Sequence, residues 1–129
     1  MTIIPNSHLD LLERPLYAHL ATIRPDGTPQ VNPMWFSWDG EFVRFTNTTD
    51  RQKYKNVTAH PQVAFSIVDP DQPYRYLEVR GVVERIDTDS SGQLFMALAE
   101  RYGMSLDGPP ADSAHRVAYV VRPRATSCQ

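Results

Sequence analysis

The segment best suited to chemistry is residues 46–56, where hydroxyl, amide and cationic side chains follow one another. Thr46 and Thr48 come first, and three cations, Arg51, Lys53 and Lys55, follow within five residues. If a strand ends at the threonines and a helix begins near the cations, the free N–H groups of the first turn and the helix dipole add to their charge. Such an arrangement binds an anion such as a phosphate through charge-assisted hydrogen bonds.

The same cations also fit a simpler interpretation, which is a charged turn that faces solvent. On a helix, Arg51 and Lys55 would share a face while Lys53 points elsewhere. All three therefore converge on one phosphate only if the helix begins late. On these residues alone we favour the solvated turn and keep the anion site as the alternative.

A second feature is residues 31–38, where large apolar side chains such as Met34, Trp35 and Trp38 fall on both faces of an expected strand. A strand that buries one face normally alternates apolar with polar residues. The outer face is therefore expected to meet a partner subunit or a flat ligand. Cover by the chain's own helices is the alternative. Pro33 also leaves a gap in the ladder where a ligand's edge could bond to backbone.

Several common catalytic motifs are missing from the sequence. It contains no glycine-rich phosphate loop, no HExxH and no paired cysteines, and its four histidines are scattered. We therefore expect no metal site and assign no catalytic residue. If the protein is an enzyme, a bound cofactor carries the chemistry and the protein supplies position and electrostatics.

Bulk properties narrow the class of protein. The 129 residues fit a single domain spanning residues 1–129. A net charge of −2 gives no basic excess for nucleic acid. No apolar run is long enough to span a membrane, and the first residues, which lack a basic start and a long apolar stretch, are not expected to be a signal peptide. The single cysteine, Cys128, fits a reducing compartment, so we expect a cytoplasmic protein.

Alternating apolar residues and turn motifs predict six strands and two or three short helices. The expected strands span residues 16–24, 30–38, 41–47, 62–68, 74–86 and 116–122. Short helices are expected after Ser7, within residues 48–60 with a start near Thr49 or Asp50, and from Asp89 to Tyr102. Asp39-Gly40 predicts a two-residue hairpin, and Gly81 predicts a bulge. Consecutive hairpins favour an antiparallel sheet that closes into a barrel.

These segments, in this order, resemble a known family. The ordered set is LAT and PDGTPQVNP within residues 20–33, RQKYKN at residues 51–56, PQVA at residues 61–64 and YLEVRG at residues 76–81. It is similar to the pyridoxamine 5′-phosphate oxidase-like superfamily, and within it to the actinobacterial branch of deazaflavin-dependent oxidoreductases that use coenzyme F420. The resemblance covers roughly residues 10–122.

The resemblance implies an FMN-binding split β-barrel, a six-stranded antiparallel Greek key, that forms a homodimer with cofactor sites at the subunit interface. The cofactor phosphate is expected against Thr46, Thr48, Arg51, Lys53 and Lys55. The cofactor ring is expected along Val31, Asn32, Pro33 and Met34. Trp35 and Tyr76 are expected to contact the cofactor from the second subunit.

The resemblance also suggests an activity, which is hydride transfer from reduced coenzyme F420 to an unsaturated small-molecule acceptor. True pyridoxamine phosphate oxidases carry a basic C-terminal extension, whereas this sequence stops just after its last expected strand, so vitamin B6 oxidation is not expected. An FMN-dependent oxidase or reductase is the first alternative. A non-catalytic binder of a flavin or haem-type cofactor is the second, and a dimer module without a ligand is the third.

Overall fold

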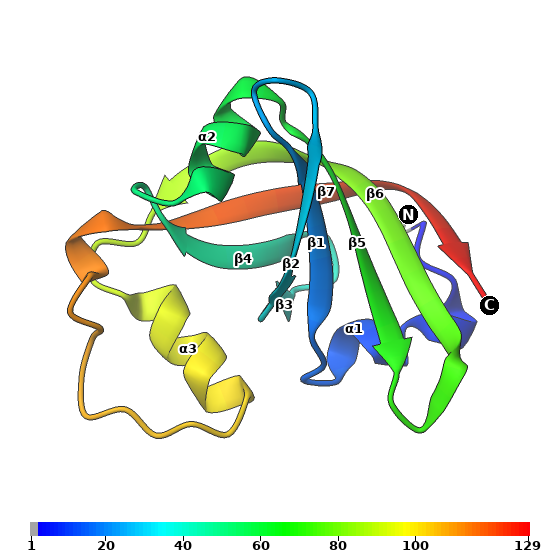
Figure 1. The fold of residues 1–129 in the computed structure, drawn as a ribbon. Helices are drawn as coiled ribbons and strands as arrows, with labels where there is room; N and C mark the ends of the chain where they lie inside the picture. The colour runs from blue at the N-terminus through cyan, green and yellow to red at the C-terminus, as the bar shows by residue number, and fades with distance from the viewer. Residues whose placement is uncertain (1–2) are drawn as a thin grey trace.

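The computed structural model describes residues 3–129 and consists mainly of one antiparallel sheet of seven strands. The strands are ordered β2-β1-β5-β6-β7-β4-β3, and the sheet curls into a half-barrel (Figure 1). The strand bounds are β1 Ala18–Ile23, β2 Pro29–Met34, β3 Ser37–Trp38, β4 Val43–Thr48, β5 Gln62–Asp69, β6 Gln72–Thr88 and β7 Arg116–Cys128. The expected mostly-β split barrel is confirmed.

The core fills the inside of the curled sheet. In β1 and β5 buried residues alternate with more exposed ones, whereas β4 and β7 contain consecutive buried residues. Phe45 of β4 meets Phe65 of β5 edge-on at 5.5 Å between ring centroids, and both are almost fully buried. Long-range pairs of this kind hold together strands that lie far apart in the sequence.

Three α-helices and two 3-10 turns complete the fold. Their bounds are η1 Asn6–His8, α1 Asp10–Glu13, α2 Gln52–Ala59, α3 Gln93–Arg101 and η2 Ser113–His115. Helix α2 lies at the end of the barrel beside the β1–β2 hairpin, and α3 lies below β4 (Figure 1). The Asp89 carboxylate accepts hydrogen bonds from the Leu94 and Phe95 N–H groups, and Gly103 follows α3 with a φ of 80°. Asp89 thus caps the first turn of α3, but the expected start at Asp89 is wrong, because the helix begins at Gln93 with Gly92 as its N-cap residue.

The expected strand over residues 30–38 is wrong as one element, because the chain turns a corner at Trp35 and Phe36. The Phe36 N–H donates to the Tyr102 hydroxyl at 3.1 Å instead of joining a ladder. Strand β2 pairs with β1, whereas β3 pairs with β4 on the opposite edge of the sheet. This break is why the sheet has seven strands and not the six expected.

The two-residue hairpin at Asp39-Gly40 is also wrong. Trp38 pairs with Val43, so the loop spans residues 39–42. The Asp39 carboxylate accepts the N–H groups of Glu41 at 2.8 Å and Phe42 at 2.7 Å, which stabilises the longer turn. By contrast, the predicted irregularity at Gly81 is confirmed, because the β6–β7 register shifts between Arg80 and Gly81.

Two other boundaries differ from expectation. Strand β7 continues to Cys128 because β6 offers it a partner as far back as Leu77. Helix α2 begins at Gln52, later than the expected Thr49 or Asp50. No helix within residues 3–129 is long and apolar enough to cross a bilayer.

Candidate functional site

The N-terminal end of α2 follows directly from the end of β4. Strand β4 ends at Thr48, and Arg51 is the N-cap of α2, with φ −91° and ψ 155°. Among residues 3–129, no side chain caps this helix, so its first N–H groups are left for solvent or a ligand. Because Arg51 precedes the helix, it does not share a helical face with Lys55. The late start is the condition under which the three cations can converge.

Among the residues that the structure describes, the three cations at the start of α2 lack the carboxylate ion pairs that most of the arginines form. Lys53 is half-buried, and Arg51 and Lys55 are exposed. Most of the chain's arginines pair with carboxylates, but within residues 3–129 none of Arg51, Lys53 and Lys55 forms an ion pair. Burial, followed by the charge of Arg51, lowers the pKa of Lys53 below its ordinary value. A bound anion would stabilise the charged form of Lys53 and so oppose both effects.

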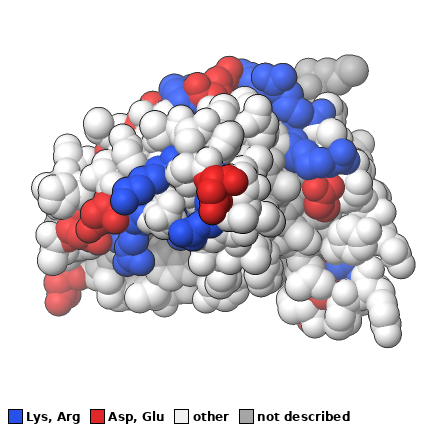
Figure 2. All heavy atoms as spheres, turned by 45° about the horizontal axis from the view of Figure 1, so that its top comes forward, with Lys and Arg blue, Asp and Glu red and all other residues white. Residues whose placement is uncertain are grey.

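The cluster is local and not a broad basic surface. Figure 2 brings the α2 end of the barrel forward and shows Lys and Arg side chains interspersed with Asp and Glu side chains. A phosphate-sized anion fits such a surface better than a nucleic acid does, because nucleic acids contact extended basic faces.

Thr46 and Thr48 are buried at the end of β4, and their hydroxyls have partners inside the chain. The Thr48 hydroxyl donates to the Asp50 carboxylate, which lies in the turn before α2. Thr46 Oγ1 accepts a hydrogen bond from Arg116 Nη1 at 3.4 Å. Their clearest role in this structure is therefore to shape the turn that leads into α2.

Arg116 is a residue of this region that sequence reasoning missed. Its guanidinium forms two hydrogen bonds with the Asp112 carboxylate, at 3.0 and 3.1 Å, and lies 4.4 Å from the centroid of the Phe95 ring. Arg116 pairs with Thr48 across β4 and β7. That pairing joins residues far apart in the sequence, so no local pattern could have identified it.

The four residues expected along the cofactor ring divide between the two faces of β2. Val31 is 62% exposed and Pro33 is also exposed, whereas Asn32 and Met34 are half-buried. Strand β2 forms one edge of the sheet, so its outer edge retains unpaired backbone groups. A flat ligand could therefore bind along this edge.

Trp35 packs within its own chain. Its indole stacks on the Tyr102 ring, with centroids 5.1 Å apart and planes inclined by 14°, and it also lies 6.0 Å from Phe95 of α3. The Tyr102 hydroxyl donates to the Leu16 carbonyl at 2.6 Å, and burial raises the pKa of Tyr102. For this part of residues 31–38, cover by the chain's own helix is thus the correct alternative.

Tyr76 lies far from the cations within one chain. It pairs with Val68 of β5, and its N–H donates to the Gln129 carbonyl at 3.0 Å. The opposite end of β6 lies near the end of β4, because Thr88 pairs with Val117 of β7 and Val117 pairs with Asn47 of β4. The chain continues from this end of β4 into α2. A single chain therefore places Thr46, Thr48 and the three cations along one segment from the end of β4 to the start of α2, and Tyr76 lies outside this region.

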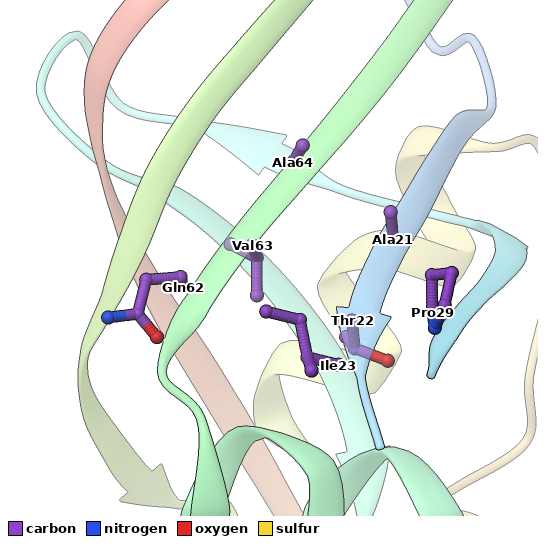
Figure 3. A pocket seen from close by; sticks show the side chains of 7 residues that line it. All are labelled: Ala21, Thr22, Ile23, Pro29, Gln62, Val63 and Ala64. Carbon is purple, nitrogen blue, oxygen red and sulfur yellow. The ribbon is translucent and has the colours of Figure 1, made fainter. Parts of the chain in front are cut away.

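An apolar hollow lies on the outer face of the sheet, next to α2. It has a volume of about 230 Å³ and is formed by β1, β2 and the start of β5 (Figure 3). The lining residues are Ala21, Thr22, Ile23, Pro29, Gln62, Val63 and Ala64. Among residues 3–129, no cluster of His, Cys, Asp and Glu is placed to hold a metal ion.

Known proteins resemble this chain over nearly its whole length. A family model described as pyridoxamine 5′-phosphate oxidase matches residues 4–127. A solved structure named an F420 reductase is 62% identical, with 96% of this chain and 98% of that chain covered at a TM-score of 0.94. None of the curated proteins matches the chain.

More distant structures share the fold alone. A conserved hypothetical protein from Mycobacterium tuberculosis is 24% identical, with 98% of this chain and 84% of that chain covered at a TM-score of 0.76. HutZ, a heme storage protein from Vibrio cholerae, is 19% identical, with 99% and 95% covered at a TM-score of 0.67. At this level of identity, the similarity describes the architecture and not the ligand.

Proposed function

Because the chain belongs to the pyridoxamine 5′-phosphate oxidase-like family, we propose that it is a cytoplasmic oxidoreductase that transfers a hydride from reduced coenzyme F420 to an unsaturated organic acceptor. The 62% identity to a structure named an F420 reductase supports this choice of cofactor. FMN is the second candidate cofactor, because it also carries a phosphate.

One observation carries the proposal more than any other, which is the unpaired cationic start of α2. Arg51 is the N-cap residue of α2 and Lys53 and Lys55 follow at its start, and among residues 3–129 none of the three forms an ion pair. This donor set fits a phosphate diester or monoester, because N–H groups, a helix dipole and cations all favour negative charge. In the proposed complex these residues hold the anionic tail of the cofactor.

The remaining residues would position the ring and the acceptor. When bound, the reduced deazaflavin supplies the hydride. The outer edge of β2 would align the ring edge, with Asn32 on one face and Val31 on the other. Trp35 is held by Tyr102 and would form a rigid wall that limits water near the acceptor. We assign no catalytic acid, because the Tyr102 proton is already donated to the Leu16 carbonyl.

The proposal includes a homodimer in which each cofactor site is completed by the partner. Val31, which is 62% exposed, lies on the outer face together with Ala21, Ile23 and Ala64 of the apolar hollow. Apolar side chains of this size are rarely left exposed together unless another surface covers them. A second copy of the chain would cover this face and bring its Tyr76 towards the cofactor.

The proposal can be tested by titrating the purified protein with coenzyme F420 and with FMN, and by following fluorescence and absorption. We expect tighter binding of coenzyme F420, followed by oxidation of its reduced form when a conjugated acceptor is added. Binding of FMN alone would select the flavin-dependent alternative. Tight binding of coenzyme F420 without turnover across a broad acceptor panel would identify a cofactor carrier, and binding of neither cofactor would reject the proposal.

A further inference from the structure

A buried amide network joins the start of α2 to the edge strand β2. Asn56 is fully buried, and its Nδ2 donates to Thr22 Oγ1 at 2.9 Å and to Gln30 Oε1 at 3.2 Å. Its Oδ1 accepts from Gln52 Nε2 at 2.9 Å. Gln52 lies between two of the cations in sequence. The helix that carries them is thus hydrogen-bonded to β1 and β2 through a single side chain.

The Arg24 guanidinium determines which way the Gln30 side-chain amide is oriented in this network. Arg24 Nη1 donates to Gln30 Oε1 at 2.9 Å, and a guanidinium can only donate. The side-chain oxygen of Gln30 must therefore face Arg24 and Asn56, and its Nε2 must face the other way. There Nε2 donates to Asn32 Oδ1 at 3.0 Å.

The orientation of the Gln30 amide in turn determines the orientation of the Asn32 amide. Its side-chain oxygen is occupied by Gln30, so its Nδ2 group is the part left to meet a ligand. In the described part of the chain, this Nδ2 has no hydrogen-bond partner. Asn32 is half-buried on the edge strand, so a ligand can reach it while solvent competes only partly.

We propose that Asn32 is a binding residue that donates a hydrogen bond to an acceptor on the ring edge of the cofactor, and that Gln30 is the positioning residue that imposes this polarity. The proposal rests on the proposed function and deepens it. The matching ligand group is a carbonyl oxygen of the pyrimidinedione ring, which flavins and deazaflavins share. The same network sets the spacing between this donor and the cations that hold the tail, because Asn56 links both.

The direction of the hydrogen bond can be tested with two substitutions at one site, using intact coenzyme F420 as the probe. Asn32→Ala removes the donor, and we expect binding to weaken by about tenfold, as for the loss of one hydrogen bond. Asn32→Asp offers only acceptors, and we expect it to bind more weakly than Asn32→Ala. Binding by Asn32→Asp that equals or exceeds that of the wild type would overturn the proposal, because the ring edge would then be a donor.

Gln30→Glu tests the positioning role. Glutamate still accepts from Arg24 and Asn56, but it cannot donate to Asn32, so the Asn32 amide turns its oxygen towards the ligand. We expect Gln30→Glu to weaken binding about tenfold in the wild type and to have no effect in the Asn32→Ala background. Equal losses in both backgrounds would show a purely structural role. Gln93→Glu, at an exposed glutamine on α3, is the matched control.

Absorption of the bound ring separates this proposal from the proposed function. Loss of a donor at a ring carbonyl should shift the absorption maximum of bound cofactor in the Asn32→Ala and Gln30→Glu variants. If the wild type binds cofactor but these variants match it in affinity and spectrum, the Asn32 proposal is wrong and the proposed function stands. If the wild type binds neither coenzyme F420 nor FMN, both fail together.

Discussion

At Lys53, burial and the neighbouring charge of Arg51 act on the pKa in the same direction. Both lower its pKa in the free protein. A bound phosphate would stabilise the ammonium form and raise this pKa, so binding takes up a proton between the two pKa values. Cofactor affinity should therefore fall as the pH rises through the lowered pKa of Lys53.

Measuring the dissociation constant by fluorescence at a series of alkaline pH values checks this prediction. We expect affinity to weaken by about tenfold once Lys53 is neutral, since a charged hydrogen bond is worth about 1.5–3 kcal/mol. Lys53→Arg keeps its charge over this range and should flatten the profile. A wild-type profile as flat as that of Lys53→Arg would show that Lys53 does not contact the anion.

Some residues of the candidate site could be predicted from the sequence, and others could not. The cations could be identified because their charge is visible in the sequence over one short segment. Arg116 could not, because its place beside Thr46 depends on β7 pairing with β4. Trp35 was recognised as unusual, but only the structure shows that the Tyr102 ring covers it.

Among the structural elements, the longest strand pair depends on Gly81. A Cβ atom at Gly81 would clash with the Arg122 carbonyl oxygen and lie 3.1 Å from Val121 Cγ1. Because one of these neighbours is backbone, the β6–β7 pair must shift to admit a side chain. Gly81→Ala should therefore destabilise the fold by about 1–3 kcal/mol, as overpacked sites typically do.

Chemical denaturation measures this change directly. Gly108→Ala is the control, because a Cβ atom there meets nothing within 4 Å and the residue lies in a loop. We expect its stability to stay within about 0.5 kcal/mol of the wild type, as is usual for surface substitutions. Equal stability of the two variants would contradict the close approach of the strands at Gly81.

Helix and strand types were predictable from hydrophobic periodicity, whereas several boundaries were not. The Asp39-Gly40 pair is typical of a two-residue hairpin, but the Asp39 carboxylate stabilises a wider turn by accepting two backbone N–H groups. Similarly, residues 30–38 have continuous strand propensity, but the Tyr102 hydroxyl accepts a hydrogen bond from the Phe36 N–H. This hydrogen bond stabilises the change of direction at Trp35 and Phe36. In both places a side-chain hydrogen bond overrides the local pattern.

In the proposed dimer, a second copy of the chain covers the outer face of the sheet and completes each cofactor site. Ala64 is half-buried in the outer apolar hollow and is not among the residues assigned to the cofactor. Ala64→Glu would place a charge in the dimer interface, so we expect the dimer dissociation constant to rise at least about tenfold. Cofactor affinity should fall with it, because each site needs the partner.

Analytical ultracentrifugation of Ala64→Glu tests this, with Ala111→Glu on an exposed loop as the matched control. A monomeric wild type would refute the dimer outright. A dimer unchanged by Ala64→Glu would place the interface on another face. The sequence alone suggested a covered outer face but could not say what covers it, because partner and ligand surfaces have the same apolar composition.

In the proposed complex, the cations at the start of α2 hold the anionic tail of the cofactor. The most direct measurement is a fluorescence titration of coenzyme F420 into the wild type and into the double variant Arg51→Ala/Lys53→Ala, with the exposed Arg124→Ala as control. We predict that the double variant loses more than about 2 kcal/mol of binding free energy while its melting temperature and the control's affinity stay unchanged. An affinity equal to that of the wild type would contradict the claim.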